Sequence, residues 1–532
     1  EKRRRRKRGT FPDPDRRVVI NPAVCEGCGD CGKASNCVAI LPLDTPLGRK
    51  RQIDQSACNK DFSCLKGFCP SFVTLSGAQP RKTVANGVDI PELPDPVLPE
   101  MDRVWNILIT GIGGTGIVTV GALLTMAAHL EGKGAAELQM AGLAQKGGAV
   151  SIHCRIAPDP ADIKSTRLTI GEADAVIAGD VVVASGGKVL DLMAPRRTRV
   201  IANSAITMTG QFAIDPGFDI PGEDLFHTIG TRVGSDAITR IDASAGAKAH
   251  LGDSIYSNVL LLGAAWQAGL VPLSRAALHR AIELNGAGIE GNLQAFELGR
   301  WLQHRALHGE TTPPDETETA DARIERLAAF LVDYQGPDLK DRFLRMVERA
   351  RQAERAKGVT GFSEAVADGY WKLLAYKDEY EIARLQLKEL DALLKRDFTS
   401  IKRVTFHLAP PLLGRRDKNG HPIKTEFGPW IRVVFRILAP MKHLRGTPLD
   451  LFGYTAERRQ ERQMIRAFEE DMEHALSALS QETLADACEL ARLPSTIKGF
   501  GHVKQANAGR ALTRKTQLLK KMGIEHRVPL SG

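Results

Sequence analysis

Residues 104–116 read Val104-Trp-Asn-Ile-Leu-Ile-Thr-Gly111-Ile-Gly113-Gly114-Thr-Gly116. The apolar run predicts a buried strand, and the glycines predict a tight turn that opens a helix over 114–130. Further apolar segments predict strands at 149–156, 175–178 and 199–202. The alternation predicts an α/β domain over residues 104–308, Rossmann-like, with a mostly parallel sheet covered by helices.

The glycine turn is a candidate cofactor site. Glycines at such a turn let a phosphate approach the positive end of a helix. The candidate cofactor-binding residues are the four glycines Gly111, Gly113, Gly114 and Gly116, and the later group Lys146, Gly147 and Gly148. An acidic residue that would hold a nucleotide ribose is expected about twenty positions on, but Glu131 falls at the helix end. NAD binding therefore stays an alternative, and so does a purely structural role in packing helix onto sheet.

Seven cysteines lie between Cys25 and Cys69, and the first three form Cys25-Glu-Gly-Cys28-Gly-Asp-Cys31. This C-x2-C-x2-C spacing is typical of 4Fe-4S clusters, because the glycines let a short loop direct three thiolates at one cluster. The fourth ligand comes from elsewhere in the chain, and Cys69, which precedes Pro70, is the natural candidate.

The remaining cysteines Cys37, Cys58 and Cys64 are candidate ligands of a second cluster that lacks one thiolate. This cluster could have three irons, or be completed by Asp61 or water, or be absent. Zinc is the main competing metal, although zinc sites usually come as two separated C-x2-C pairs. Disulfides are a third alternative.

Composition and charge describe an ordinary soluble chain. Its 532 residues suffice for two to four domains, and six of its nine net positive charges lie in residues 1–8. We read residues 1–8 as a basic tail, or as a linker severed from an upstream part of a longer polypeptide. Glycines interrupt the uncharged stretches at 107–128 and 255–274, so both predict buried core and no membrane span. The expected location is cytoplasmic.

The change of composition along the chain predicts five parts. After the basic tail comes a cysteine-rich, ferredoxin-like segment at 9–78, and then a linker at 79–103 with five prolines. The α/β domain at 104–308 is followed by a mainly α-helical domain at 309–532. In the latter, apolar residues at three- and four-residue spacing predict helices at 321–334, 339–357, 378–397 and 456–479.

Other chemically suggestive residues are assigned structural roles. Cys154 and Cys488 are interpreted as buried small side chains. His153 points to the opposite face of its strand from Cys154, so the two do not form a nucleophile and base. The stretch 498–504, Lys-Gly-Phe-Gly-His-Val-Lys, is interpreted as an exposed loop between helices.

These motifs together resemble the gamma domain of the 2-oxoacid:ferredoxin oxidoreductases. The resemblance rests on the cysteine segment, the glycine turn, Gln145-Lys-Gly-Gly148 and Ser257-Asn-Val-Leu-Leu-Leu-Gly-Ala264. The stretches from Asp54 to Phe72 and from Tyr376 to Arg384 resemble the fused bacterial indolepyruvate ferredoxin oxidoreductases.

The resemblance implies an oxidoreductase that decarboxylates an aryl 2-oxoacid to an acyl-CoA and passes electrons through iron-sulfur clusters to ferredoxin. It implies thiamine diphosphate with Mg, and coenzyme A as co-substrate. The chain has no Gly-Asp-Gly motif with a following Asn, so the thiamine site is expected in upstream domains or a partner subunit. The catalytic residues are unknown. We expect a homo-oligomer.

Two functions from other classes remain as alternatives. One is an iron-sulfur NAD(P)-dependent dehydrogenase with its nicotinamide at the glycine turn. The other is a metal-stapled nucleic-acid-binding protein. The second is disfavoured because residues 1–8 carry no aromatic side chains for base stacking.

Overall fold

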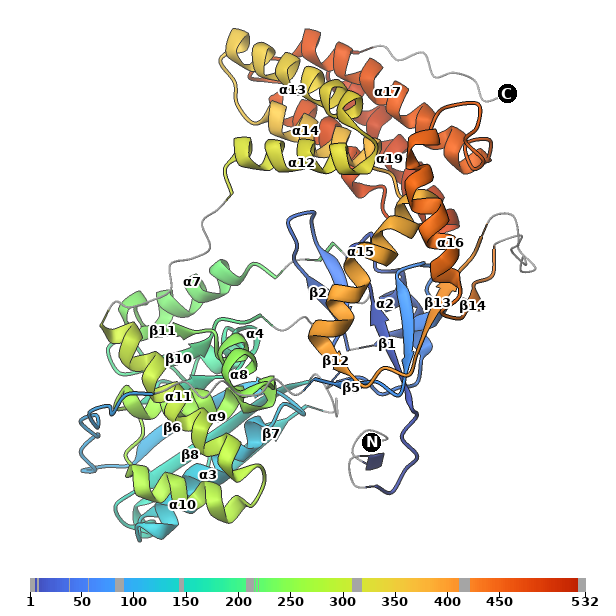
Figure 1. The fold of residues 1–532 in the computed structure, drawn as a ribbon. Helices are drawn as coiled ribbons and strands as arrows, with labels where there is room; N and C mark the ends of the chain where they lie inside the picture. The colour runs from blue at the N-terminus through green and yellow to red at the C-terminus, as the bar shows by residue number, and fades with distance from the viewer. Residues whose placement is uncertain are drawn as a thin grey trace. The chain divides into compact units, whose positions relative to one another are not determined.

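The computed structural model describes residues 5–6, 9–37, 39–55, 57–81, 90–142, 148–206, 215, 217–218, 220–308, 318–410 and 422–524. The chain forms two compact units (Figure 1). Unit 1 comprises Glu1–Arg81, Ala213–Pro216 and Asp315–Gly532, and unit 2 comprises Lys82–Phe212 and Gly217–Pro314. Among the described helices, none combines the length and apolar character needed to cross a membrane.

Unit 2 is an α/β domain built on a six-stranded sheet of order β11-β10-β9-β6-β8-β7. The four strands from β11 to β6 run parallel, and β8 and β7 add an antiparallel edge. The strands are β6 (Trp105–Ile112), β7 (Gly134–Ala141), β8 (Ala149–Ala157), β9 (Ala175–Ala178), β10 (Arg199–Asn203) and β11 (Ile238–Ile241). The predicted, mostly parallel α/β fold is therefore confirmed.

Helices cover both faces of this sheet because its strands are apolar on both sides. In β6, Ile107 and Ile109 join one core, and Leu108 joins the other. The helices are α3 (Ile117–Leu130), α4 (Val181–Ala184), α5 (Gly187–Leu190), α7 (Gly222–Val233), α8 (Ala243–Leu251), α9 (Ser257–Gln267), α10 (Arg275–Asn285) and α11 (Ile289–Leu307), with short 3-10 turns η2 (Pro160–Asp162), η3 (Ser235–Ala237) and η4 (Ser254–Tyr256).

The four predicted strands coincide with β6, β8, β9 and β10, but the first helix starts later than the predicted residue 114. It begins at Ile117 because Gly114 and Gly116 have φ angles of +89° and +91°, which lie outside the right-handed helical region. The stretch predicted as buried core at 255–274 contains α9, of which every residue is buried.

Two glycines let α9 and α11 approach closely within unit 2. A Cβ atom on Gly263 would lie 2.0 Å from the backbone oxygen of Phe296, and one on Gly299 would lie 1.9 Å from that of Leu260. Real Cβ atoms do not come this near to backbone oxygens, so only glycine fits at either position.

We predict that Gly299→Ala forces α9 and α11 apart and destabilises unit 2 by about 1–3 kcal/mol or more. Hydrogen exchange of the amides in α9 and α11 should accelerate accordingly. Gly187→Ala is the matched control, because a Cβ there meets nothing within 4 Å. Equal exchange in the two variants would contradict the close approach.

Unit 1 combines the cysteine-rich segment with the C-terminal region. Its four-stranded antiparallel sheet has the order β1-β4-β13-β14. The N-terminal elements are β1 (Arg16–Ile20), α2 (Asp30–Ser35), β2 (Ile40–Leu43), β3 (Lys50–Ile53), η1 (Ser63–Lys66), β4 (Phe72–Ser76) and β5 (Gln79–Pro80). The pairing of β4 with β13 (Arg403–Leu408) makes the C-terminal region a structural partner of the cysteine-rich segment.

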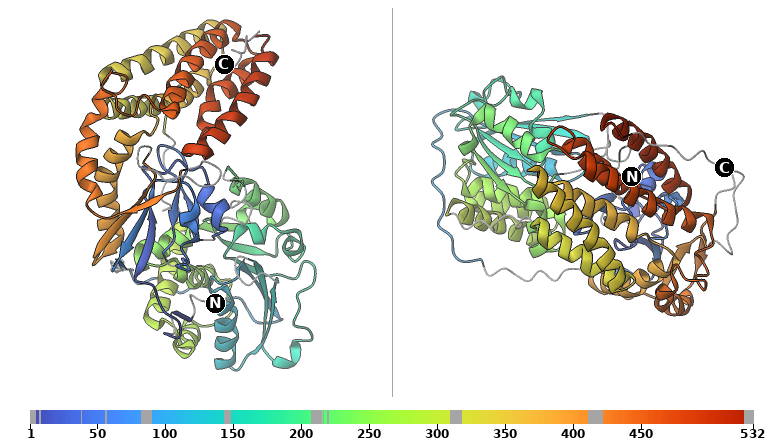
Figure 2. Two further views of the ribbon diagram at one scale, coloured as in Figure 1. Left: turned by 90° about the vertical axis from the view of Figure 1, so that its right-hand side faces the viewer. Right: turned by 90° about the horizontal axis from the view of Figure 1, so that it is seen from above.

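The rest of the C-terminal region is mainly helical (Figure 2), and most of its helices, though not α15 and α16, pack on a core of their own. The elements are α12 (Ala320–Tyr334), α13 (Pro337–Lys357), α14 (Phe362–Leu374), α15 (Glu379–Asp397), β12 (Phe398–Thr399), β14 (Thr425–Phe427), α16 (Ile431–Leu438), η5 (Ala439–Leu444), α17 (Ala456–Ala478), α18 (Leu484–Arg492), η6 (Leu493–Thr496) and α19 (Gly501–Lys521). The four predicted helices correspond to α12, α13, α15 and α17.

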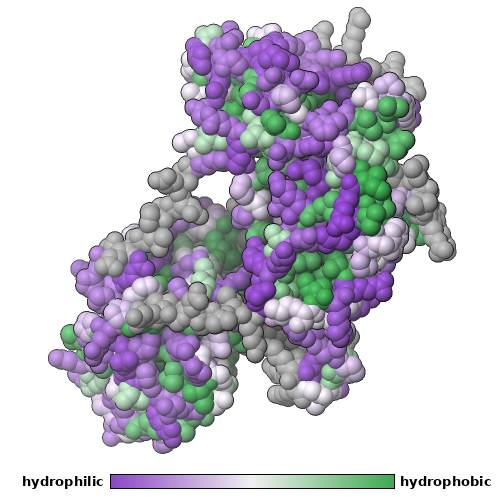
Figure 3. All heavy atoms as spheres, viewed as in Figure 1, coloured by the Kyte–Doolittle hydropathy of each residue, from purple (hydrophilic) through white to green (hydrophobic). Residues whose placement is uncertain are grey.

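The surface of unit 1 carries one apolar stripe along α16. Val433 and Ile437 on the helix, and Trp430 just before it, are each more than half exposed. They coincide with a hydrophobic area over α16 in Figure 3. The opposite side of the helix is buried through Ile431 and Phe435.

Candidate metal centre

The seven predicted cysteine ligands all belong to unit 1 and are all free thiols. Cys31 lies in α2, Cys64 lies in η1, and Cys69 lies three residues before β4. The other four lie in loops. Cys25, Cys31, Cys64 and Cys69 are buried in one apolar cluster, which also contains Phe72 and Phe500.

The thiols fall into two electrostatic groups. Cys25 and Cys28 act on both Cys31 and Cys69, whereas Cys37 and Cys58 act on Cys64. The first group is the predicted set Cys25, Cys28, Cys31 and Cys69. The second group is Cys37, Cys58 and Cys64, and Asp61 is close enough to act on Cys37 and Cys64 as well.

Glycines hold the loops of the first group close together. Gly27 has φ +70°, and a Cβ there would lie 2.2 Å from the backbone oxygen of Arg49. Gly67 lies against α2, where a Cβ would be 2.8 Å from Cα of Cys31. The backbone also points donors at sulfur: Gly27 N donates to Cys25 Sγ at 3.3 Å, and Lys60 N donates to Cys58 Sγ at 3.3 Å.

Burial makes the metal-free thiolates unfavourable. It raises the pKa of the Cys28 thiol to about 11 and the pKa of Cys64 to about 12. Burial is also the largest cause that raises the pKa values of Cys31, Cys37 and Cys69. A bound metal supplies the positive charge that such buried sulfurs need, because a coordinating thiol is deprotonated outright.

Within the described part of the chain, no three His, Cys, Asp or Glu side chains are close enough together to hold a single metal ion. One zinc ion, with Zn–S distances of about 2.3 Å, would bring its thiolates to roughly 4 Å from one another. A cluster spreads its ligands over several irons, so its thiolates lie farther apart.

A buried carboxylate and two lysines form the most notable ionic contact beside the first group. Glu26 lies inside the cysteine motif, and its side chain is 5% exposed. It is ion-paired with Lys372 and, at 2.9 Å, with Lys377. Lys377 Nζ also donates to the backbone oxygen of Cys25 at 3.2 Å. These two lysines hold the pKa of Glu26 well below its usual range, against the opposing effect of burial.

Other cations also face the thiols. Arg51 is 2% exposed and faces Cys25, Cys31 and Cys28. Lys424 donates to the backbone oxygen of Gly67 and faces Cys69 and Cys64. Local sequence patterns did not single out Lys372, Lys377 and Lys424, because they come from a segment far from the cysteines in the chain.

The interpretation of residues 498–504 as an exposed loop is wrong. Phe500 is 8% exposed and packs in the apolar cluster of the cysteines. A Cβ on Gly499 would lie 3.4 Å from Cβ of Cys28, and the ring of His502 is 5.0 Å from that of Phe68. The glycine and aromatic residues of this stretch therefore cover the cysteine motif.

The glycine turn of unit 2 is a separate candidate site. Gly111 is buried against Ile117, and Gly113 N donates to the backbone oxygen of Gly148 at 2.8 Å. Gly114 and Gly116 are exposed, and Asn258 Nδ2 supports the turn by donating to Thr115 O at 2.8 Å. The predicted Lys146 and Gly147 lie outside the described residues.

The acidic residue considered for a nucleotide ribose has a structural role. Glu131 accepts hydrogen bonds from Ser274 N and Lys133 Nζ, both at 2.7 Å, and so fixes the start of α10. The predicted separation of His153 and Cys154 holds as well. Cys154 is buried in the core beside α3, whereas His153 Nδ1 accepts from Leu168 N on the other face.

We predict that Gly67→Ala separates η1 from α2 and destabilises the cysteine segment by about 1–3 kcal/mol. Hydrogen exchange over residues 28–35 and 63–69 of the metal-free chain should rise. Gly48→Asn is the control, since a side chain there meets no atom within 4 Å and asparagine tolerates the φ of +86°. Unchanged exchange in Gly67→Ala would refute the tight contact.

Comparison with known proteins assigns families to both large regions. Residues 106–302 match the family described as pyruvate ferredoxin/flavodoxin oxidoreductase. Residues 320–517 match a family of unknown function, DUF6537. Neither match includes the cysteine segment.

Curated relatives cover the α/β domain. The indolepyruvate oxidoreductase subunit IorB of Methanothermobacter thermautotrophicus is 27% identical over 197 residues, which are 37% of this chain and 95% of that protein. The IorB subunit of Thermococcus kodakarensis is 27% identical over 202 residues, 37% of this chain and 94% of that protein.

Among solved structures, the pyruvate oxidoreductase subunit PORC of Thermotoga maritima is similar at 19% identity and a TM-score of 0.28, over 37% of this chain and 96% of that one. The 2-oxoglutarate:ferredoxin oxidoreductase of Magnetococcus marinus is similar at 18% identity and a TM-score of 0.28, over 44% of this chain and 38% of that one. The family match and the IorB relatives thus make residues 106–302 a domain similar to the 2-oxoacid:ferredoxin oxidoreductases, of the indolepyruvate type.

Proposed function

We propose that this chain is the electron-transfer and gamma-domain part of an indolepyruvate-type ferredoxin oxidoreductase, with iron-sulfur clusters in unit 1. The observation that carries the proposal is that Cys25 and Cys28 act electrostatically on both Cys31 and Cys69, while Cys25, Cys31 and Cys69 share one apolar cluster. The grouping brings a C-x2-C-x2-C run together with a distant cysteine that precedes a proline, which is the ligand pattern of a 4Fe-4S cluster.

The donor set fits such a cluster in three ways. Four of the seven thiols are buried, backbone N–H groups donate to sulfur, and cations face the sulfurs. An all-cysteine cluster is an anion, so Arg51 and Lys424 would offset the cost of burying it. Cys37, Cys58 and Cys64 would hold a second cluster. The carboxylate of Asp61, which acts on Cys64, is the candidate for its fourth ligand.

The clusters supply one-electron transfer, which the two-electron oxidation of a 2-oxoacid needs on its way to ferredoxin. Thiamine diphosphate and Mg would bind in an upstream domain or a partner subunit. Coenzyme A would accept the acyl group. The exposed backbone at Gly114 and Gly116 is a candidate contact for its phosphates.

We predict that the chain, purified without oxygen, contains iron and acid-labile sulfide. About eight irons per chain would mean two cubanes, about seven a cubane and a three-iron cluster, and about four a single cluster at the first group. Chemical analysis, combined with an electron paramagnetic resonance spectrum after dithionite reduction, makes the measurement. Zinc without sulfide would overturn the proposal.

Replacing single cysteines tests the grouping itself. Cys69→Ser should abolish the signal of the first cluster and leave that of the second, whereas Cys64→Ser should do the reverse. Cys154→Ser is the matched control, since that thiol lies in the core of unit 2. Loss of both signals in every variant, with the chain still folded, would contradict two separate groups.

The whole enzyme tests the substrate assignment. Indolepyruvate and other aryl 2-oxoacids should reduce ferredoxin in a coenzyme A-dependent way, and Cys69→Ser should lower the rate at least tenfold. Ferredoxin bleaching in the visible spectrum follows the reaction. Reduction of NAD in place of ferredoxin would favour a nicotinamide-dependent dehydrogenase.

A further inference from the structure

Residues 320–517, which match a family of unknown function, pack directly on the cysteine segment within unit 1. Gln386 Nε2 donates to the backbone oxygen of Pro70 at 2.9 Å, next to Cys69. Asn21 Nδ2 donates to Gln386 Oε1 at 3.1 Å and to the backbone oxygen of Leu385 at 3.3 Å. These buried contacts hold α15 against the loops that carry the first thiol group.

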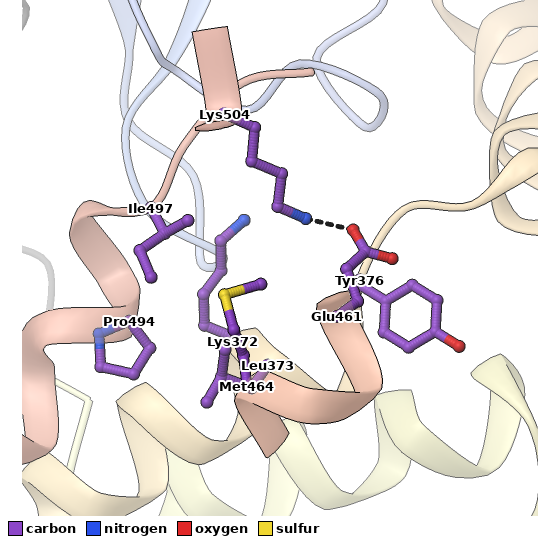
Figure 4. A pocket seen from close by; sticks show the side chains of 8 residues that line it. All are labelled: Lys372, Leu373, Tyr376, Glu461, Met464, Pro494, Ile497 and Lys504. Carbon is purple, nitrogen blue, oxygen red and sulfur yellow. Dashed lines mark hydrogen bonds and ion pairs between the residues drawn. The ribbon is translucent and has the colours of Figure 1, made fainter. Parts of the chain in front are cut away.

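The same region supplies several partly buried cations. Lys372 and Lys377 both pair with the single carboxylate of Glu26, and their side chains are 18% and 12% exposed. Lys504 lies nearby and pairs with Glu461 at the rim of a small pocket that Lys372 also lines (Figure 4). Lys498 faces both Glu26 and Cys28. Four lysines of the C-terminal region thus gather beside one cysteine motif.

Besides the charges, the stretch 498–504 supplies residues that cover the cysteine motif sterically. Phe500 fills the apolar cluster around the thiols, and Gly499 brings the backbone against Cys28. Gly501 does the same against Phe68, since a Cβ there would lie 2.7 Å from the ring. Larger residues at 499 or 501 would push this stretch off the motif.

We propose that the region 320–517 encloses the cluster of Cys25, Cys28, Cys31 and Cys69 and sets its reduction potential through Lys372, Lys377 and Glu26. This inference rests on the cluster assignment made above. The physical basis is that a cluster becomes more negative when it takes up an electron. A buried cation favours the reduced state and a buried carboxylate opposes it, and neither is strongly screened by solvent. The three side chains are positioning residues, because none is proposed as a ligand.

The test is a pair of charge changes with opposite expected signs. Lys372→Met should lower the midpoint potential of the first cluster, and Glu26→Gln should raise it. The expected size is a threefold to tenfold change in the ratio of reduced to oxidised cluster at a fixed potential, where tenfold equals 59 mV for a one-electron couple. Electron paramagnetic resonance during a redox titration of the full chain measures it.

Lys521→Met is the matched control. It removes a lysine from α19, the helix that begins at residue 501, but about 30 Å along that helix at 1.5 Å per residue. Its midpoint potential should equal that of the unchanged chain. Equal potentials in Lys372→Met and Lys521→Met, or shifts of the same sign in Lys372→Met and Glu26→Gln, would overturn the electrostatic part.

If the Lys372→Met variant does not retain its cluster, the midpoint potential of the Glu26→Gln variant alone tests the inference. The substitution is nearly isosteric, so an upward shift with unchanged iron and sulfide supports the inference, and an unchanged or lower potential overturns it. If the chain without substitutions contains zinc and no sulfide, the cluster assignment itself is refuted. Chemical analysis for iron, zinc and sulfide therefore distinguishes failure of the cluster assignment from failure of the inference.

Enclosure is tested separately by Phe500→Ala. Opening the apolar cover should speed the loss of cluster absorbance to an iron chelator several-fold. Leu512→Ala, at a position 61% exposed on α19, should leave the rate unchanged. Equal rates in the two variants would refute enclosure, whatever the potentials show.

Discussion

The pairing of β4 with β13 is the constraint on which unit 1 depends. It joins residues that are far apart in the chain, and the hydrogen bond between Thr74 and His407, 2.6 Å long, spans 333 positions. Without β13, β4 would have one open edge of backbone N–H and C=O groups. A cysteine segment of this size also buries little apolar surface alone, so its stability depends on packing partners, to which the proposed clusters would add.

Like the strand pairing, the side-chain packing of unit 1 joins the cysteine segment to the C-terminal region. Val73 and Leu75 of β4 share a core with Leu390 of α15 and Phe435 of α16. On the other side of the segment, the thiols share a core with Phe500. The cysteine segment thus packs on two parts of the C-terminal region, α15 and the residue that precedes α19.

Local patterns in the sequence predicted much of the fold. Apolar runs located β6, β8, β9 and β10, and helical spacing located α12, α13, α15 and α17. The assignment of the thiols to two sets of cluster ligands stays a prediction from their spacing. A short strand such as β11 was missed, since Ile238-Thr-Arg-Ile241 has only two apolar residues.

The contacts that the sequence did not reveal are all long-range. Nothing in the neighbourhood of Lys372 indicates that its partner is Glu26, 346 positions away. Residues 498–504 look like a polar loop because Lys498 and Lys504 flank them, yet their aromatic and glycine residues meet a surface from the other end of the chain. Periodicity describes which face of an element is buried, but it does not identify what buries it.

Unit 1 is discontinuous in the chain, and this has a consequence for synthesis. The cysteine segment is complete once residue 81 has been made, but β13 ends at residue 408 and α19 at residue 521. At about 5–20 residues per second, the ribosome needs roughly 15–65 s to reach β13 and longer to reach Phe500. During that interval the seven thiols stand without their cover, so under the proposed cluster assignment iron and sulfide would have a time window that closes when the C-terminal region folds.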